Sequence, residues 1–129
     1  MTDTYAFLIR EKDWDSDSVL PDAAPSPTQV GEMFGAHQAF QQAVAELGLR
    51  LVGGNALQNA SYGGLVQPGS GERAVEDAVY TDSPYADSSE LITGFYAVEC
   101  EDEATARKVA AMVPTNGTIE WRKIFPMQG

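Results

Sequence analysis

The chain contains a single histidine, His37, in a position that suits acid–base chemistry. It belongs to a row of residues that recur at alternating steps of three and four, which predicts a helix with one face toward the core. The other members of this row are Val30, Met33, Phe40, Val44 and Leu47. Burial lowers the pKa of an imidazole and a neighbouring carboxylate raises it. His37 is therefore a candidate general base or acid, and a hydrogen-bonded core histidine is the alternative.

A carboxylate that could pair with His37 is Asp82. It ends a predicted strand at a Ser-Pro dipeptide, where a side-chain oxygen can accept backbone N–H bonds or reach into a cleft. Asp87 and Glu90 extend the acidic cluster toward the next strand. The pair would support proton transfer in a small-molecule site. The alternatives are an Asx-type turn at Asp82 and a solvated surface for the other acids.

The charge balance limits the classes of partner. The chain has 19 acidic and 8 basic residues and a formal net charge of −11. Such a field repels phosphate backbones and anionic membrane surfaces, so we expect no direct nucleic acid and no membrane partner. No apolar run approaches the roughly 20 residues of a membrane span, and the first residues lack a basic secretory segment. We therefore expect a cytoplasmic protein.

Metal and cofactor chemistry has little support in the sequence. Cys100 is the only cysteine, which excludes an intrachain disulfide and a multi-thiolate zinc site, and we interpret it as an apolar filler. Acids alternate at positions 13, 15 and 17, but Ser18 and Ala24 stand where an EF-hand needs glycine and glutamate. We expect no metal and no cofactor. Trp14 is interpreted as a packing residue.

Periodicity and turn residues predict seven elements. Strands are expected at 5–10, 49–57, 74–82, 92–100 and 117–125. Helices are expected at 28–48, with Thr28 as the N-cap, and at 102–113. A proline-containing acidic loop covers 11–27, and a glycine-rich loop or loose hairpin covers 58–71. Gly53-Gly54 within the second strand indicates a β-bulge or a close backbone approach.

This order, β-α-β-β-β-α-β, predicts one α+β domain over residues 1–129 with a ferredoxin-like split βαβ arrangement. Both helices of such a fold cover one face of the sheet. The other face needs cover, and two sheets that pack together provide it. We therefore expect a homodimer.

Residues 82–96 resemble the signature of the YCII-related (DGPF) family without a gap. Identical positions are Asp82, Pro84, Ala86, Glu90, Leu91, Gly94, Phe95 and Tyr96. Residues 36–40 with the following glycines look like the family's first helix and second strand, and residues 117–122 look like its last strand. The resemblance implies a dimeric α+β barrel and a His/acid pair that lines a pocket. His37 stands at the position of the family's histidine, and Asp82 is the candidate for the acid, which the resemblance itself leaves open.

The resemblance also frames the function. It implies a small-molecule-binding protein, either a lyase or hydrolase that uses His37 and Asp82, or a noncatalytic dimeric binding or regulatory module associated with sigma-factor signalling. Candidate ligand-binding residues are Tyr85, Asp87, Glu90 and Tyr96. Ser83 and Ser89 replace the glycine and lysine of the signature, so a ligand site that depends on that lysine is absent. Tyr85 replaces its phenylalanine and adds a phenol that can donate to a ligand.

Overall fold

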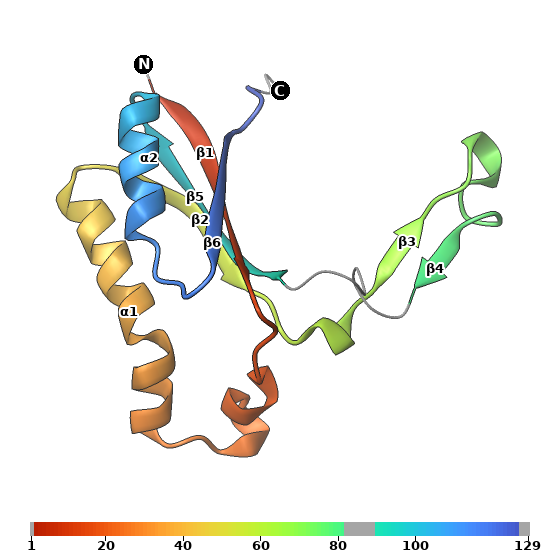
Figure 1. Ribbon diagram of the computed structural model, residues 1–129, viewed down its shortest axis with the longest axis horizontal. Helices are drawn as coiled ribbons and strands as arrows, with labels where there is room; N and C mark the ends of the chain where they lie inside the picture. The colour runs from red at the N-terminus through yellow and green to blue at the C-terminus, as the bar shows by residue number, and fades with distance from the viewer. Residues whose placement is uncertain (1, 82–89, 127–129) are drawn as a thin grey trace.

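Four antiparallel strands and two helices form the body of the protein, as the computed structural model shows in Figure 1. The structure describes residues 2–81 and 90–126. The strands are β1 (Asp3–Glu11), β2 (Arg50–Ala56), β5 (Leu91–Cys100) and β6 (Thr118–Lys123), in the order β2-β5-β1-β6. This order, with α1 (Pro27–Glu46) and α2 (Glu103–Met112) as crossovers, confirms the predicted α+β ferredoxin-like fold.

The core lies between the sheet and the helices. Alternation along β1 turns Tyr5, Phe7 and Ile9 to the helix side, where Phe7 is fully buried. Residues of the other elements complete the core: Phe40, Val44, Tyr96, Val98, Cys100, Ala106, Val109, Ala110 and Val113. Cys100 is among them, so its interpretation as an apolar filler is confirmed. Among the described residues, no helix is long and apolar enough to cross a membrane.

Helix α1 begins two residues earlier than predicted. Ser26, and not Thr28, is the N-cap: its hydroxyl accepts a hydrogen bond from the Gln29 backbone N–H at 3.1 Å. The Gln29 side chain accepts in return from the Ser26 backbone N–H at 2.9 Å. This reciprocal capping box, with Pro27 in the first helical position, fits the start of the helix better than Thr28 does.

The apolar row is buried only at Phe40 and Val44, since its last member, Leu47, is 43% exposed. Phe40 and Val44 are buried, whereas Val30 and Met33 are 37% and 40% exposed. The reason is visible in Figure 1, where the N-terminal half of α1 extends beyond the ends of the strands. That half covers a space beside the sheet instead of the sheet itself.

The prediction of a third sheet strand at 74–82 is wrong in its placement. Among the strands that the structure describes, β4 (Val79–Thr81) pairs only with β3 (Leu65–Gln67), and the two form a hairpin that extends away from the body (Figure 1). Val79 and Tyr80 are 63% and 70% exposed, so the weak alternation did not reflect a buried face. The glycine-rich region before it is the other half of this hairpin.

The double glycine in β2 serves both of the predicted purposes. The register between β2 and β5 shifts between Leu51 and Gly53, which is the irregularity of a β-bulge. At Gly54 a Cβ atom would lie 2.6 Å from Cδ1 of Tyr96 and 3.0 Å from the Phe95 carbonyl oxygen. Gly54 therefore leaves room for the Tyr96 ring.

We expect Gly54→Ala to lower the free energy of unfolding by about 1–3 kcal/mol, because the added methyl group overpacks against Tyr96. Gly53→Ala is the matched control, since a Cβ there meets no atom within 4 Å, and its effect should stay within about 0.5 kcal/mol. Urea denaturation of the two variants measures the difference. Equal stabilities would contradict the close approach at Gly54.

Candidate functional site

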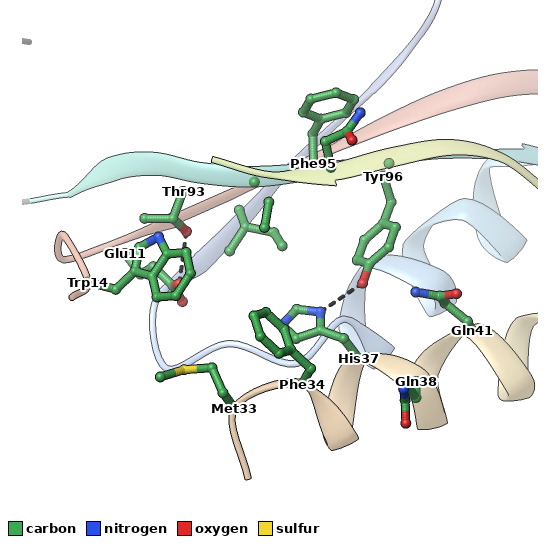
Figure 2. A pocket seen from close by; sticks show the side chains of 15 residues that line it. Glu11, Trp14, Met33, Phe34, His37, Gln38, Gln41, Thr93, Phe95 and Tyr96 are labelled. Carbon is green, nitrogen blue, oxygen red and sulfur yellow. Dashed lines mark hydrogen bonds between the residues drawn. The ribbon is translucent and has the colours of Figure 1, made fainter. Parts of the chain in front are cut away.

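A cavity of about 430 Å³ lies where α1 extends beyond the sheet. Its walls come from β1, β2 and β5, from the middle of α1 and from the loop after β1. Figure 2 shows Thr93, Glu11 and Trp14 at one end, Tyr96 and Gln41 toward the other, and Phe34 and His37 between them.

His37 faces this cavity from α1 and meets Tyr96 of β5. The distance between His37 Nδ1 and the Tyr96 hydroxyl oxygen is 2.8 Å (Figure 2). Burial lowers the pKa of His37, and the negative charge of Glu11 acts in the opposite direction. Since the ordinary value of 6.5 is already below 7, the imidazole is mainly neutral at pH 7.

Tyr96 is the buried partner in this hydrogen bond. Burial raises the pKa of its phenol, while a hydrogen bond from the Gln41 side chain opposes the rise. The phenol is therefore protonated at neutral pH. Its ring packs on Phe40, with ring centroids 4.8 Å apart, and fits over Gly54. These contacts hold the hydroxyl group in place beside the imidazole.

Two arrangements of the proton connect these neutral groups. The phenol can donate to Nδ1, which leaves a hydrogen on Nε2, or Nδ1–H can donate to the phenol oxygen, which leaves a lone pair on Nε2. In the first arrangement His37 offers a donor at Nε2, and in the second it offers a base. Exchange between the two arrangements therefore changes Nε2 from a donor to a base without any change in net charge.

Glu11, the last residue of β1, places a carboxylate in the same cavity. Its Oε1 atom accepts a hydrogen bond from Thr93 Oγ1 at 2.8 Å, and its Oε2 atom accepts one from Thr115 Oγ1 at 2.7 Å. Thr93 is itself buried, at 7% exposure. The sequence analysis placed Glu11 in the acidic loop. Strict alternation from Phe7 and Ile9 was the signal that could have assigned it to the helix side of β1.

Thr93 reaches the helix side because β5 contains a bulge. Ile9 pairs with Gly94 and Arg10 pairs with Ile92, so Thr93 has no partner on β1. Thr93 and Gly94 are consequently both buried, which breaks the alternation, and Ile92 is 40% exposed. The extra residue supplies the hydroxyl that holds Glu11.

Trp14 brings the loop after β1 to the cavity. Its indole N–H donates to the Leu57 carbonyl oxygen at 2.8 Å, and its ring meets Phe34 edge to face, with centroids 6.4 Å apart and an interplanar angle of 89°. Ser16 and Asn59 hold the loop through reciprocal hydrogen bonds, at 2.7 Å to the Asn59 side chain and 2.9 Å to the Ser16 hydroxyl. Trp14 thus packs as predicted and also lines the cavity.

The predicted site residues fall into three groups. His37 and Tyr96 lie together at the cavity. Asp82, Tyr85 and Asp87 lie outside the described residues, so their predicted roles remain predictions. Glu90 precedes β5, where it accepts a hydrogen bond from Thr118 at 3.0 Å and lines a different depression, next to Arg10. Among the described residues, the acid that lines the cavity with His37 is Glu11, which the sequence analysis did not select.

Residues that could hold a metal ion do not gather anywhere in the described ranges, where no group of three His, Cys, Asp or Glu side chains has suitable spacing. The groups at the cavity are instead hydrogen-bonding and acid–base groups: an imidazole, a phenol, a carboxylate and the amides of Gln38, Gln41 and Asn55. Such a set can bind a small organic molecule and exchange protons with it.

Comparison with curated proteins finds no match. The family model of the YCII-related domain matches residues 5–128. This range includes the residues of the strands and of α1 that line the cavity. The match therefore extends well beyond the signature at 82–96. The chain belongs to the YCII-related domain family.

Proposed function

We propose that the cavity binds a small organic molecule and that His37 exchanges a proton with it. The observation that carries this proposal is the 2.8 Å hydrogen bond between His37 Nδ1 and the Tyr96 hydroxyl at the wall of a cavity of about 430 Å³. A base that is held by a third group beside open space is the usual arrangement for proton transfer.

In the proposed mechanism His37 acts as the base through Nε2 while Tyr96 accepts from Nδ1–H and fixes the plane of the ring. Proton uptake makes an imidazolium, which the negative charge of Glu11 stabilises, since that charge raises the pKa of His37. Glu11 thus takes the electrostatic role for which the sequence favoured Asp82. The reaction class that this supports is proton abstraction or donation in a lyase or hydrolase.

The pKa of His37 tests the electrostatic part of this proposal. The wild-type value should lie below 6.5, because burial outweighs the charge of Glu11, and Glu11→Gln should lower it further. Glu46→Gln, at the exposed end of α1, is the control and should leave the value unchanged. NMR titration is direct because the chain has one histidine. An unchanged or higher pKa in Glu11→Gln would contradict the role of Glu11.

Turnover tests the catalytic part. For a compound that the wild-type protein converts in a metabolite panel, His37→Gln should reduce kcat/KM by about 10²–10⁴-fold. The base must be neutral, so kcat/KM should be constant around pH 7 and fall as the pH decreases through the lowered pKa of His37. Tyr96→Phe keeps the ring and should reduce the rate less. Full activity of His37→Gln, or binding without conversion across the panel, would reject catalysis at this site.

We also propose that two chains assemble through the sheet face opposite the helices. Both helices lie on one side of the sheet in Figure 1. Alternation places Ala6 and Leu8 of β1 with Phe95 and Ala97 of β5 on the other side, where all four are only partly buried. Glu120 of the edge strand β6 lies opposite Leu8 and forms an ion pair with Arg10 at 2.9 Å, so the charges beside this apolar group are already paired. A second copy of the face is a self-complementary cover.

Light scattering should therefore give about twice the chain mass of 13.9 kDa at micromolar concentration. Leu8→Glu places a charge at the centre of the proposed interface and should shift the protein to the monomer. Val30→Glu adds the same charge to an exposed apolar position on α1 and should leave the dimer intact. A wild-type monomer, or equal masses for the two variants, would contradict assembly through this face.

A further inference from the structure

The charges around the cavity point to the class of ligand. All eight Lys and Arg residues of the chain lie within the described ranges, and none of them lines the cavity. Arg10, the basic residue of the strand that carries Glu11, forms an ion pair with Glu120 of the neighbouring strand β6 at 2.9 Å. A phosphate or carboxylate would therefore enter the cavity without a cationic side chain to compensate its charge.

The carboxylate of Glu11 keeps its negative charge exposed to the ligand. Thr93 and Thr115, which donate hydrogen bonds to its two oxygens, are hydroxyl donors, and these orient and stabilise a carboxylate but do not neutralise it. Within the part of the chain that the structure describes, Glu11 makes no ion pair with Lys or Arg. A charge fixed in this way beside a partly desolvated space attracts a cation and repels an anion.

Two aromatic rings line the cavity with this carboxylate. Trp14 and Phe34 come from different elements and stand nearly perpendicular, with an interplanar angle of 89°, so they form two walls of a corner. Figure 2 shows Trp14 at the end of the cavity that Glu11 occupies. Aromatic faces attract ammonium groups through the negative charge of the π system, and Trp does so most strongly.

We propose that the ligand is an organic cation, a protonated or quaternary amine with an apolar body, whose ammonium group lies between Glu11 and Trp14. This inference rests on the proposed function, since it names the ligand class of the same cavity. The far end of the cavity, with His37 and Tyr96, then receives a neutral polar group of the same molecule. The net charge of −11 helps by drawing cations toward the protein.

Three probes that differ mainly in charge test the proposal: 2-phenylethylammonium, 2-phenylethanol and 3-phenylpropanoate. Titration followed through the His37 ring signals should show the ammonium probe binding at least about tenfold more tightly than the alcohol. The carboxylate probe should bind most weakly. Equal affinity for the three probes, or a preference for the carboxylate, would overturn the cation proposal and leave small-molecule binding intact. Failure of all three to perturb His37 would overturn both.

Two variants locate the preference. Glu11→Gln keeps the volume of the side chain and should reduce the ammonium-to-alcohol affinity ratio to about one, whereas Glu46→Gln should leave that ratio unchanged. Trp14→Leu should reduce the affinity for the ammonium probe by about fivefold or more, in a variant whose NMR spectrum keeps the chemical-shift dispersion of a folded protein. An ammonium preference that survives in both Glu11→Gln and Trp14→Leu would place the cation elsewhere and overturn the proposal.

Discussion

The pairing of β1 with β5 is the interaction on which the site depends. These central strands carry the fixed groups of the cavity: Glu11 on β1, and Thr93 and Tyr96 on β5. Each strand is held on both sides, β1 by β5 and β6, and β5 by β1 and β2. Their register sets how far the carboxylate lies from the phenol along the sheet. The neighbouring strand β2, the helix α1 with His37, and the loop with Trp14 add the remaining walls to this frame.

The sequence predicted the parts of this fold that follow from regular periodicity. Strands with clean alternation, such as β1 and β5, and the helix row that contains His37 appear where they were expected. The positions of Phe40 and Val44 in that row are enough to turn His37 toward the sheet. The resemblance over residues 82–96 was also enough to predict the family, since the family match covers residues 5–128.

Irregular features account for what the sequence did not predict. The bulge at Thr93 changes which side chains of β5 face α1, and nothing in the alternating pattern of 92–100 marks one extra residue. Glu11 was grouped with the acids that follow it because its partners, Thr93 and Thr115, are distant in sequence. The hairpin of β3 and β4 was misplaced for a related reason: three-residue strands carry too few side chains to define a face.

The threonine clasp around Glu11 has a consequence for how the protein matures. Glu11 ends the first strand, Thr93 lies in β5, and Thr115 follows α2. The two hydrogen bonds therefore join segments that lie far apart in the sequence. Contacts of such long sequence separation form late, once the intervening loops have closed. Local hydrogen bonds within α1 do not depend on these contacts, whereas the orientation of the Glu11 carboxylate does. The oriented carboxylate is therefore a late product of folding, because it needs β5 and the segment after α2 in their final places beside β1.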